Sequence, residues 1–146
     1  MKPTQYFALT IGIIYLIMGV MGGSSTFIQP AAIDLDSTNM VVTAYSNLLG
    51  LFPVNSAHNV VHLLIGIVGI VASIALDSSR LYSGALSIFY GLLAVMGLVP
   101  IASSTFGLIP LFGNDVWLHA GTAAIAAYFG FIVKPDLLEI SKVPSP

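Results

Sequence analysis

The sequence predicts an all-α fold: an integral membrane four-helix bundle built from two tandem, parallel-related helical hairpins. Composition is the first reason, because 57% of the 146 residues are hydrophobic and only 7% are charged. An ordinary soluble domain carries about 25% charged residues. The second reason is an internal repeat, in which distant segments of the chain resemble each other at constant offsets. The lipid bilayer is therefore the expected environment of the chain, and the repeat predicts how its helices are arranged.

Four apolar segments are each close to the length, roughly 20 residues, that crosses the core of a bilayer. We predict membrane spans at about Tyr6–Phe27, Ala57–Leu76, Leu81–Ser103 and Val116–Val133. Residues 1–146 are interpreted as a single transmembrane domain. The first apolar stretch is too long for a secretory signal and lacks an A-x-A cleavage site, so we interpret it as a span.

The second half of each hairpin contains the clearest part of the repeat. The segments are LFPVNSAHNVVHLLIG, from Leu51 to Gly66, and LIPLFGNDVWLHAG, from Leu108 to Gly121. Residues 57 positions apart in them correspond: Gly50 with Gly107, Leu51 with Leu108, Pro53 with Pro110, His58 with Asp115 and His62 with His119.

The first halves correspond at a different offset, 75 positions. The matched pairs include Tyr15 with Tyr90 and Met21 with Met96. Because the offsets 75 and 57 differ by 18, the connection inside repeat one (residues 6–76) is 18 residues longer than that inside repeat two (residues 81–133). An even number of spans per repeat makes the two hairpins parallel, related by an axis along the membrane normal.

The longer connection of repeat one is predicted to contain a short interfacial helix. Ser37 and Thr38 are suitable caps for it. The residues that would form its apolar side are Met40, Val41, Val42, Ala44, Tyr45, Leu48 and Leu49. Such a helix would lie on the bilayer or over the mouth of the bundle, where it would act as a lid.

Charged residues predict the orientation of the chain. Its basic residues lie at the N-terminus, between spans two and three, or in the C-terminal tail: Lys2, Arg80, Lys134 and Lys142. By the positive-inside rule, both termini and a turn at Asp77–Arg80 are cytoplasmic, in a bacterial inner or thylakoid-type membrane. All three histidines then lie at the outer face. The net charge of −2 gives no basic patch, which argues against nucleic acid as a partner.

Four polar residues near the outer face form the candidate site. His58 and His62 are four positions apart and share one face of span two, and Asp115 and His119 do the same on span four. A polar face is costly in hydrocarbon, so we expect both stripes to converge inside the bundle. Three imidazoles and a carboxylate suit a tetrahedral zinc site or another first-row metal. Alternatively, His62 and His119 alone are the axial pair of a haem or bind the magnesium of chlorophyll.

Simpler roles compete with these. Asp115 suits a helix N-terminus, and His58 could be hydrated among lipid headgroups. His62 and His119 could hydrogen-bond to each other, directly or through water, or act in a proton relay. The paired methionines lie near the histidine level, where thioethers would favour copper, although packing is their ordinary role. The paired tyrosines near the midplane are expected to hydrogen-bond within the bundle.

Three functions follow from these residues. The first is a non-enzymatic membrane protein whose histidine cluster binds a metal ion or a tetrapyrrole. The second is a structural or assembly subunit, with a partner in a larger membrane complex or in a homo-oligomer, suggested by glycine-rich helix faces and short loops. The third is a small proton-linked transporter that uses His58 and His62. The chain has no nucleophile motif, phosphate-binding loop or paired acid and base, which argues against an enzyme.

The pieces Phe52–Asn55 (FPVN) and His58–His62 (HNVVH), followed by a P-x-x-x-x-D-x-x-x-H segment, resemble a known family. It is a bacterial family of small four-span membrane proteins, the domain-of-unknown-function family numbered forty-three eighty-three. The resemblance covers about Ile11 to Phe131 and implies four spans but no activity. One departure is Leu111–Asn114, which stands where a second asparagine-bearing turn is expected and weakens the prediction of a polar role for that loop.

Overall fold

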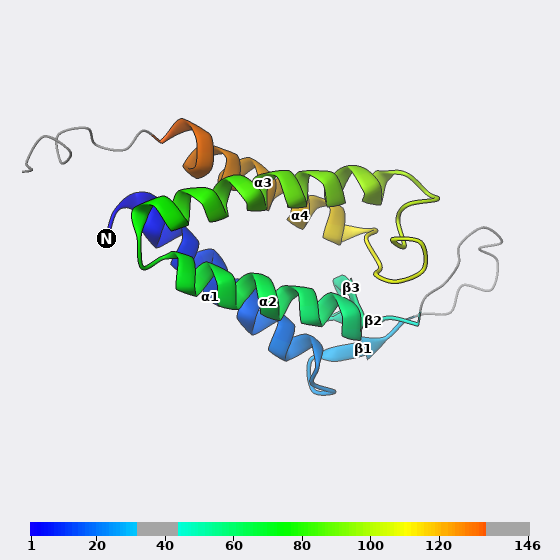
Figure 1. The fold of residues 1–146 in the computed structure, drawn as a ribbon. Coiled ribbons are helices and arrows are strands. Elements are labelled where there is room, and N and C mark those ends of the chain that lie inside the picture. The colour runs from blue at the N-terminus through cyan, green and yellow to red at the C-terminus, as the bar shows by residue number, and fades with distance from the viewer. Residues whose placement is uncertain (32–43, 134–146) are drawn as a thin grey trace, which may run out of the picture.

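The computed structural model describes residues 1–31 and 44–133. These residues form four α-helices: α1 (Pro3–Gly22), α2 (Ser56–Ala72), α3 (Leu76–Leu98) and α4 (Asn114–Ala127). A π-helix, Tyr128–Ile132, continues α4. Helix α1 packs along α2 and α3 packs along α4, so the chain forms two hairpins (Figure 1).

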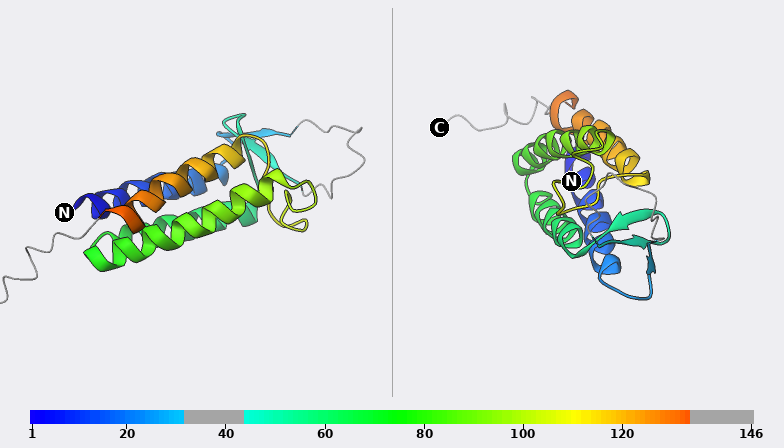
Figure 2. Two further views of the ribbon diagram at one scale, coloured as in Figure 1. Left: turned by 90° about the horizontal axis from the view of Figure 1, so that it is seen from above. Right: turned by 90° about the vertical axis from the view of Figure 1, so that its right-hand side faces the viewer.

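The two hairpins run in the same direction, as the repeat predicts. The N-terminus and the end of the π-helix lie at one end of the bundle, and the connection 99–113 lies at the other (Figures 1 and 2). Local sequence explains where several helices begin and end. Pro3 occupies the first turn of α1, where its missing N–H costs nothing. Helix α3 ends at Leu98, just before the Val99-Pro100 pair, and a residue preceding proline disfavours helical backbone.

One predicted turn is wrong, and two helices are shorter than the spans predicted for them. The turn predicted at Asp77–Arg80 lies within the first turns of α3, and the hairpins are joined by residues 73–75. Asp77 is in the first turn of α3, where a carboxylate is stabilised by the helix N-terminus, so these polar residues begin the helix and do not interrupt it. Helices α1 and α3 also end about five residues before the predicted outer ends of their spans, at Gly22 and Leu98.

A small antiparallel sheet covers the end of the α1–α2 hairpin. Its strands are β1 (Ile28–Pro30), β2 (Ser46–Leu48) and β3 (Phe52–Val54), in the order β1-β2-β3. The interfacial helix predicted up to Leu49 is therefore wrong over Ser46–Leu48, because these residues pair with strands on both sides. Ala44, Tyr45 and Leu49 are not helical either. The part at 40–43, together with the predicted caps at 37 and 38, lies outside the described residues.

The repeat extends to the backbone conformation of the outer connections. Leu49 and Gly50, between β2 and β3, have φ angles of 54° and 72°. Phe106 and Gly107, which lie 57 positions later, have φ angles of 56° and 91°. Such left-handed conformations are strained for most residues and easy for glycine, which explains why a glycine occupies the second position of each pair.

The bundle buries many polar side chains beside its apolar core and exposes large apolar side chains on its outside. Buried side chains include His58, His62, Asp115, His119, Thr4, Ser79 and Ser83. Large apolar side chains face outward along the helices, among them Leu64, Val71, Ile88, Leu92 and Val95. By length and composition, α1 and α3 are able to cross a membrane. Close helix packing inside the bundle depends on glycines, since a Cβ atom on Gly66 would lie 2.6 Å from the backbone nitrogen of Leu16 on α1.

Candidate metal centre

Three histidines meet between α2 and α4. Each of His58, His62 and His119 offers one ring nitrogen, and these nitrogens all lie within 4.8 Å of one another. The three side chains are almost fully buried, at 2%, 1% and 0% exposure. The two polar stripes therefore converge in the structure, as the repeat predicts, and His62 and His119 lie at the same site.

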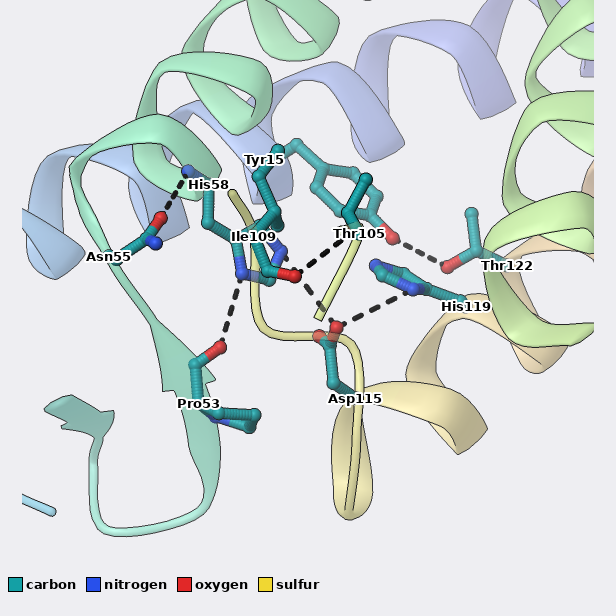
Figure 3. Close-up of polar contacts among 9 residues, drawn as sticks. All are labelled: Tyr15, Pro53, Asn55, His58, Thr105, Ile109, Asp115, His119 and Thr122. Carbon is teal, nitrogen blue, oxygen red and sulfur yellow. Dashed lines mark hydrogen bonds and ion pairs between the residues drawn. The ribbon is translucent and has the colours of Figure 1, made fainter. Parts of the chain in front are cut away.

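His58 is fixed by the residues that begin α2. The Asn55 side chain caps the helix by accepting a hydrogen bond from the backbone N–H of His58, at 2.9 Å. The Nδ1 atom of His58 lies 3.1 Å from the carbonyl oxygen of Pro53 (Figure 3). A carbonyl oxygen only accepts, so Nδ1 carries the proton and donates. The lone pair of the neutral imidazole is consequently on Nε2, the nitrogen that approaches Asp115.

Asp115, in the first turn of α4, is fully buried beside the imidazoles. Its Oδ2 atom lies 3.5 Å from Nδ1 of His119 and 3.9 Å from Nε2 of His58 (Figure 3). The mutually close set of ligand atoms consists of the three imidazoles, and the carboxylate stands next to it. The four residues predicted as metal ligands are thus brought together, with Asp115 at the edge of the group.

Most polar atoms of this group have no hydrogen-bond partner. Among the described residues, both ring nitrogens of His62, both of His119 and both carboxylate oxygens of Asp115 are buried and unpartnered. Each such atom costs about 1–3 kcal/mol, since the water it gives up on folding is not replaced. Lone pairs concentrated at one buried point are the arrangement that a cation would stabilise.

Two tyrosines form the inner wall of the site. The Tyr15 ring lies 5.0 Å from that of His62, the Tyr90 ring lies 4.7 Å from that of His119, and the tyrosine rings stack at 5.0 Å between centroids. The Tyr15 hydroxyl hydrogen-bonds to Thr122 Oγ1 at 2.8 Å, as predicted for a bundle tyrosine. The Tyr90 hydroxyl is buried with no hydrogen-bond partner among the described residues. Sequence reasoning missed their contact with the histidines, although the repeat pairs Tyr15 with Tyr90.

The outer side of the site is closed by contacts exchanged between the hairpins. Asn55 donates from its side-chain amide to the carbonyl of Leu108 at 2.8 Å, and Asn114 donates to that of Leu51 at 3.3 Å. Leu51 and Leu108 are repeat equivalents, so an asparagine of each hairpin donates to the equivalent carbonyl of the other hairpin. Within the segment Leu111–Asn114, Asn114, the first residue of α4, makes this polar contact.

Comparison with known proteins gives a family and nothing closer. The sequence profile described as Domain of unknown function (DUF4383) matches residues 5–132. No curated protein and no solved structure matches the chain.

Proposed function

We propose, for a chain that belongs to the DUF4383 family of domains of unknown function, that it is an integral membrane protein that binds one transition-metal ion at its buried histidine centre. The resemblance found in the sequence is thus confirmed, but the family supplies no activity. The proposal therefore rests on the chain's own residues. The observation that carries it is the set of six buried atoms on His62, Asp115 and His119 that have no hydrogen-bond partner among the described residues.

The distribution of side chains supports a location in the bilayer. Soluble proteins bury large apolar residues and expose polar ones, whereas this bundle buries histidine, serine and threonine and exposes residues such as Ile74 (79%) and Leu81 (76%). Helix α2 has 17 residues, about 26 Å at the rise of an α-helix, close to the roughly 30 Å of a bilayer core. We propose four spans, formed by α1, α2, α3 and α4 with its π-helix, as one transmembrane domain.

The orientation follows from the basic residues. Lys2 precedes α1 and Arg80 lies in the first turns of α3. Both of these helix starts lie at the end of the bundle opposite the sheet (Figure 1). The positive-inside rule makes that end cytoplasmic, so both termini face the cytoplasm and the metal centre lies in the outer half of a bacterial inner or thylakoid-type membrane.

Zinc is the metal that the donor set suits best. Ligands of a tetrahedral zinc ion, bound at about 2.0–2.1 Å, are about 3.3 Å apart. The ring nitrogens that His58, His62 and His119 offer are at most 4.8 Å apart. Asp115 Oδ2 lies beside this set, 3.5 Å from Nδ1 of His119 and 3.9 Å from Nε2 of His58. Small side-chain rotations would therefore close the site. The hydrogen bond from His58 to Pro53 is of the kind that orients metal-binding imidazoles.

A tetrapyrrole fits this site poorly. A haem bound axially by His62 and His119 needs a flat space between the two imidazoles that is large enough for the whole porphyrin ring. The ring of His58 lies 4.3 Å from that of His62 and 6.0 Å from that of His119, and tyrosine rings pack directly on both. Copper remains the alternative ion, and the half-buried Met21 and Met96 are the residues that would favour it.

Metal analysis of the purified protein tests this function. The full chain is extracted in mild detergent, and zinc, copper and iron are measured by mass spectrometry before and after dialysis against zinc. We expect about one zinc per chain, retained in Asn114→Ala, which alters the mouth and no proposed ligand. His62→Ala and His119→Ala should lose the metal while circular dichroism keeps its helical signal. A metal-free wild type whose melting temperature neither zinc nor copper raises would contradict the proposal.

Two other functions stay predictions. The subunit hypothesis drew on glycine-rich helix faces, but Gly12 and Gly66 pack against each other's helices and are not available to a partner chain. The transporter hypothesis needs polar groups along α2 beyond His62. The buried residues there are Gly66, Gly69 and Ala72, which do not relay protons.

A further inference from the structure

We infer that the metal centre takes one small anion from outside the chain, either hydroxide derived from water or a halide-like anion, at a fourth coordination position. This inference rests on the proposed metal binding and adds the class of ligand that the bound ion would accept. It follows from the number of donors in the centre, from their charge and from the unpartnered hydroxyl of Tyr90.

The number of donors leaves one position open. His58 donates from Nδ1 to Pro53, so it ligates through Nε2. Nδ1 of His119 faces Asp115 Oδ2 at 3.5 Å, which leaves Nε2 of His119 for the metal. With one nitrogen from His62, the chain supplies three ligands, and Asp115 acts on His119 as the carboxylate of a carboxylate–histidine–metal triad. Zinc sites with three protein ligands keep their fourth position for an exogenous ligand.

The charge of the centre specifies an anion. Three neutral imidazoles leave the full double charge of a divalent ion, and Asp115 offsets one unit of it. A buried site with net charge near +1 is costly unless a further negative charge is present. The other charged side chains in the described part of the chain are Lys2, Asp77 and Arg80, which lie at the starts of α1 and α3, at the opposite end of the bundle. No further negative charge lies near the centre in the described part of the chain, and we assign the compensating charge to a monoanion from solvent.

Tyr90 provides a donor for that anion. Its ring lies 4.7 Å from that of His119, and its hydroxyl is buried without a partner in the described part of the chain. The repeat-related Tyr15 is already engaged with Thr122. The position equivalent to Thr122 in repeat one is Ile65, 57 residues earlier, which has no hydroxyl. Tyr90 thus lacks the threonine partner that Tyr15 has, and an anion beside His119 would take its O–H in preference to the neighbouring Tyr15 hydroxyl.

Anion titration of the cobalt-loaded protein tests this inference. The full chain in detergent is saturated with Co²⁺, and sodium thiocyanate is added while the visible cobalt bands are recorded. We expect a saturable change with one anion per cobalt. Asp115→Asn should bind thiocyanate at least about tenfold more tightly, because a nearby negative charge is removed. Tyr90→Phe should weaken thiocyanate binding several-fold, whereas the matched variant Tyr82→Phe, whose hydroxyl bonds to the carbonyl of Ile65, should not.

The outcomes separate this inference from the function on which it rests. Failure of the wild type to bind Co²⁺ would overturn both. Cobalt bands that thiocyanate leaves unchanged in both the wild type and Asp115→Asn would show that the chain fills all positions, and would overturn the inference alone. Equal thiocyanate affinity in Tyr90→Phe and Tyr82→Phe would overturn the role assigned to Tyr90.

Discussion

Replacing Gly66 by alanine should separate α1 from α2 and destabilise the bundle. The added Cβ atom would lie 2.6 Å from the backbone nitrogen of Leu16 and 2.8 Å from the carbonyl oxygen of Gly12. Both contacts are with backbone, so no side-chain rotation relieves them and the helices must shift. Overpacking of this kind costs about 1–3 kcal/mol. Alanine regains about 0.5–1 kcal/mol through its better helix propensity, so a net loss centred near 1 kcal/mol, in a range of about 0–2.5 kcal/mol, is expected.

Gly121→Ala is the matched control, because a Cβ atom at Gly121 meets nothing within 4 Å. Alanine there gains helix propensity at no steric cost, so this variant should be as stable as the wild type or slightly more stable. Stability is measured as reversible unfolding in mixed micelles with increasing sodium dodecyl sulfate. Gly66 follows His62 by about one helical turn, so Gly66→Ala should also bind zinc more weakly. Equal stability of the two variants would refute the close approach of α1 and α2.

Three further predictions concern the polar groups of the bundle. Tyr15→Phe leaves the Thr122 hydroxyl without its partner and should lower the free energy of unfolding by about 1–2 kcal/mol. In a double-mutant cycle with Thr122→Val, the two substitutions should show a coupling energy of about 1 kcal/mol. Purely additive effects would contradict the hydrogen bond. Asn55→Ala removes both a helix cap and a contact between hairpins and should cost about 1–2 kcal/mol. This is more than Asn114→Ala should cost, because Asn114 makes a longer contact and caps no helix; the reverse order in the same unfolding assay would count against this account. A chelator should lower the melting temperature of the wild type by several degrees and leave that of His62→Ala unchanged. Only a protein that holds the metal loses the stabilisation that metal binding supplies. Equal shifts in the two proteins would indicate a nonspecific effect of the chelator.

The sequence predicted the histidine centre well because the repeat is a strong signal. A constant offset of 57 positions links His62 to His119, and two equivalent helices with inward polar faces must bring such residues together. A polar face on a single helix would not have identified the helix that packs against it. The repeat also pairs Tyr15 with Tyr90, although only the structure shows that their rings contact the imidazoles, one edge-on and one tilted.

Other features depended on contacts that local sequence does not encode. The strands β1 and β2 are three residues each and pair across a long separation, so neither has a periodicity that distinguishes it from a loop or a short helix. Asp77 was interpreted as part of a turn because charge is rare in this chain, but charge is favourable in the first turn of a helix. The exchanged asparagine contacts involve backbone carbonyls, which every residue has, and so leave no trace in the sequence.

The positions of His58 and Asp115 have a consequence for how such a centre could arise. Two separate copies of one hairpin would be obliged to place the same side chain at both positions, giving two imidazoles or two carboxylates. Two carboxylates would neutralise a divalent ion fully and leave no charge for an external anion, and two imidazoles would leave it uncompensated. Joining the hairpins through the short segment 73–75 frees each copy to differ. A single polypeptide can therefore place a neutral donor, His58, on one side of the centre and a negative charge, Asp115, on the other. Two identical hairpins cannot form this combination.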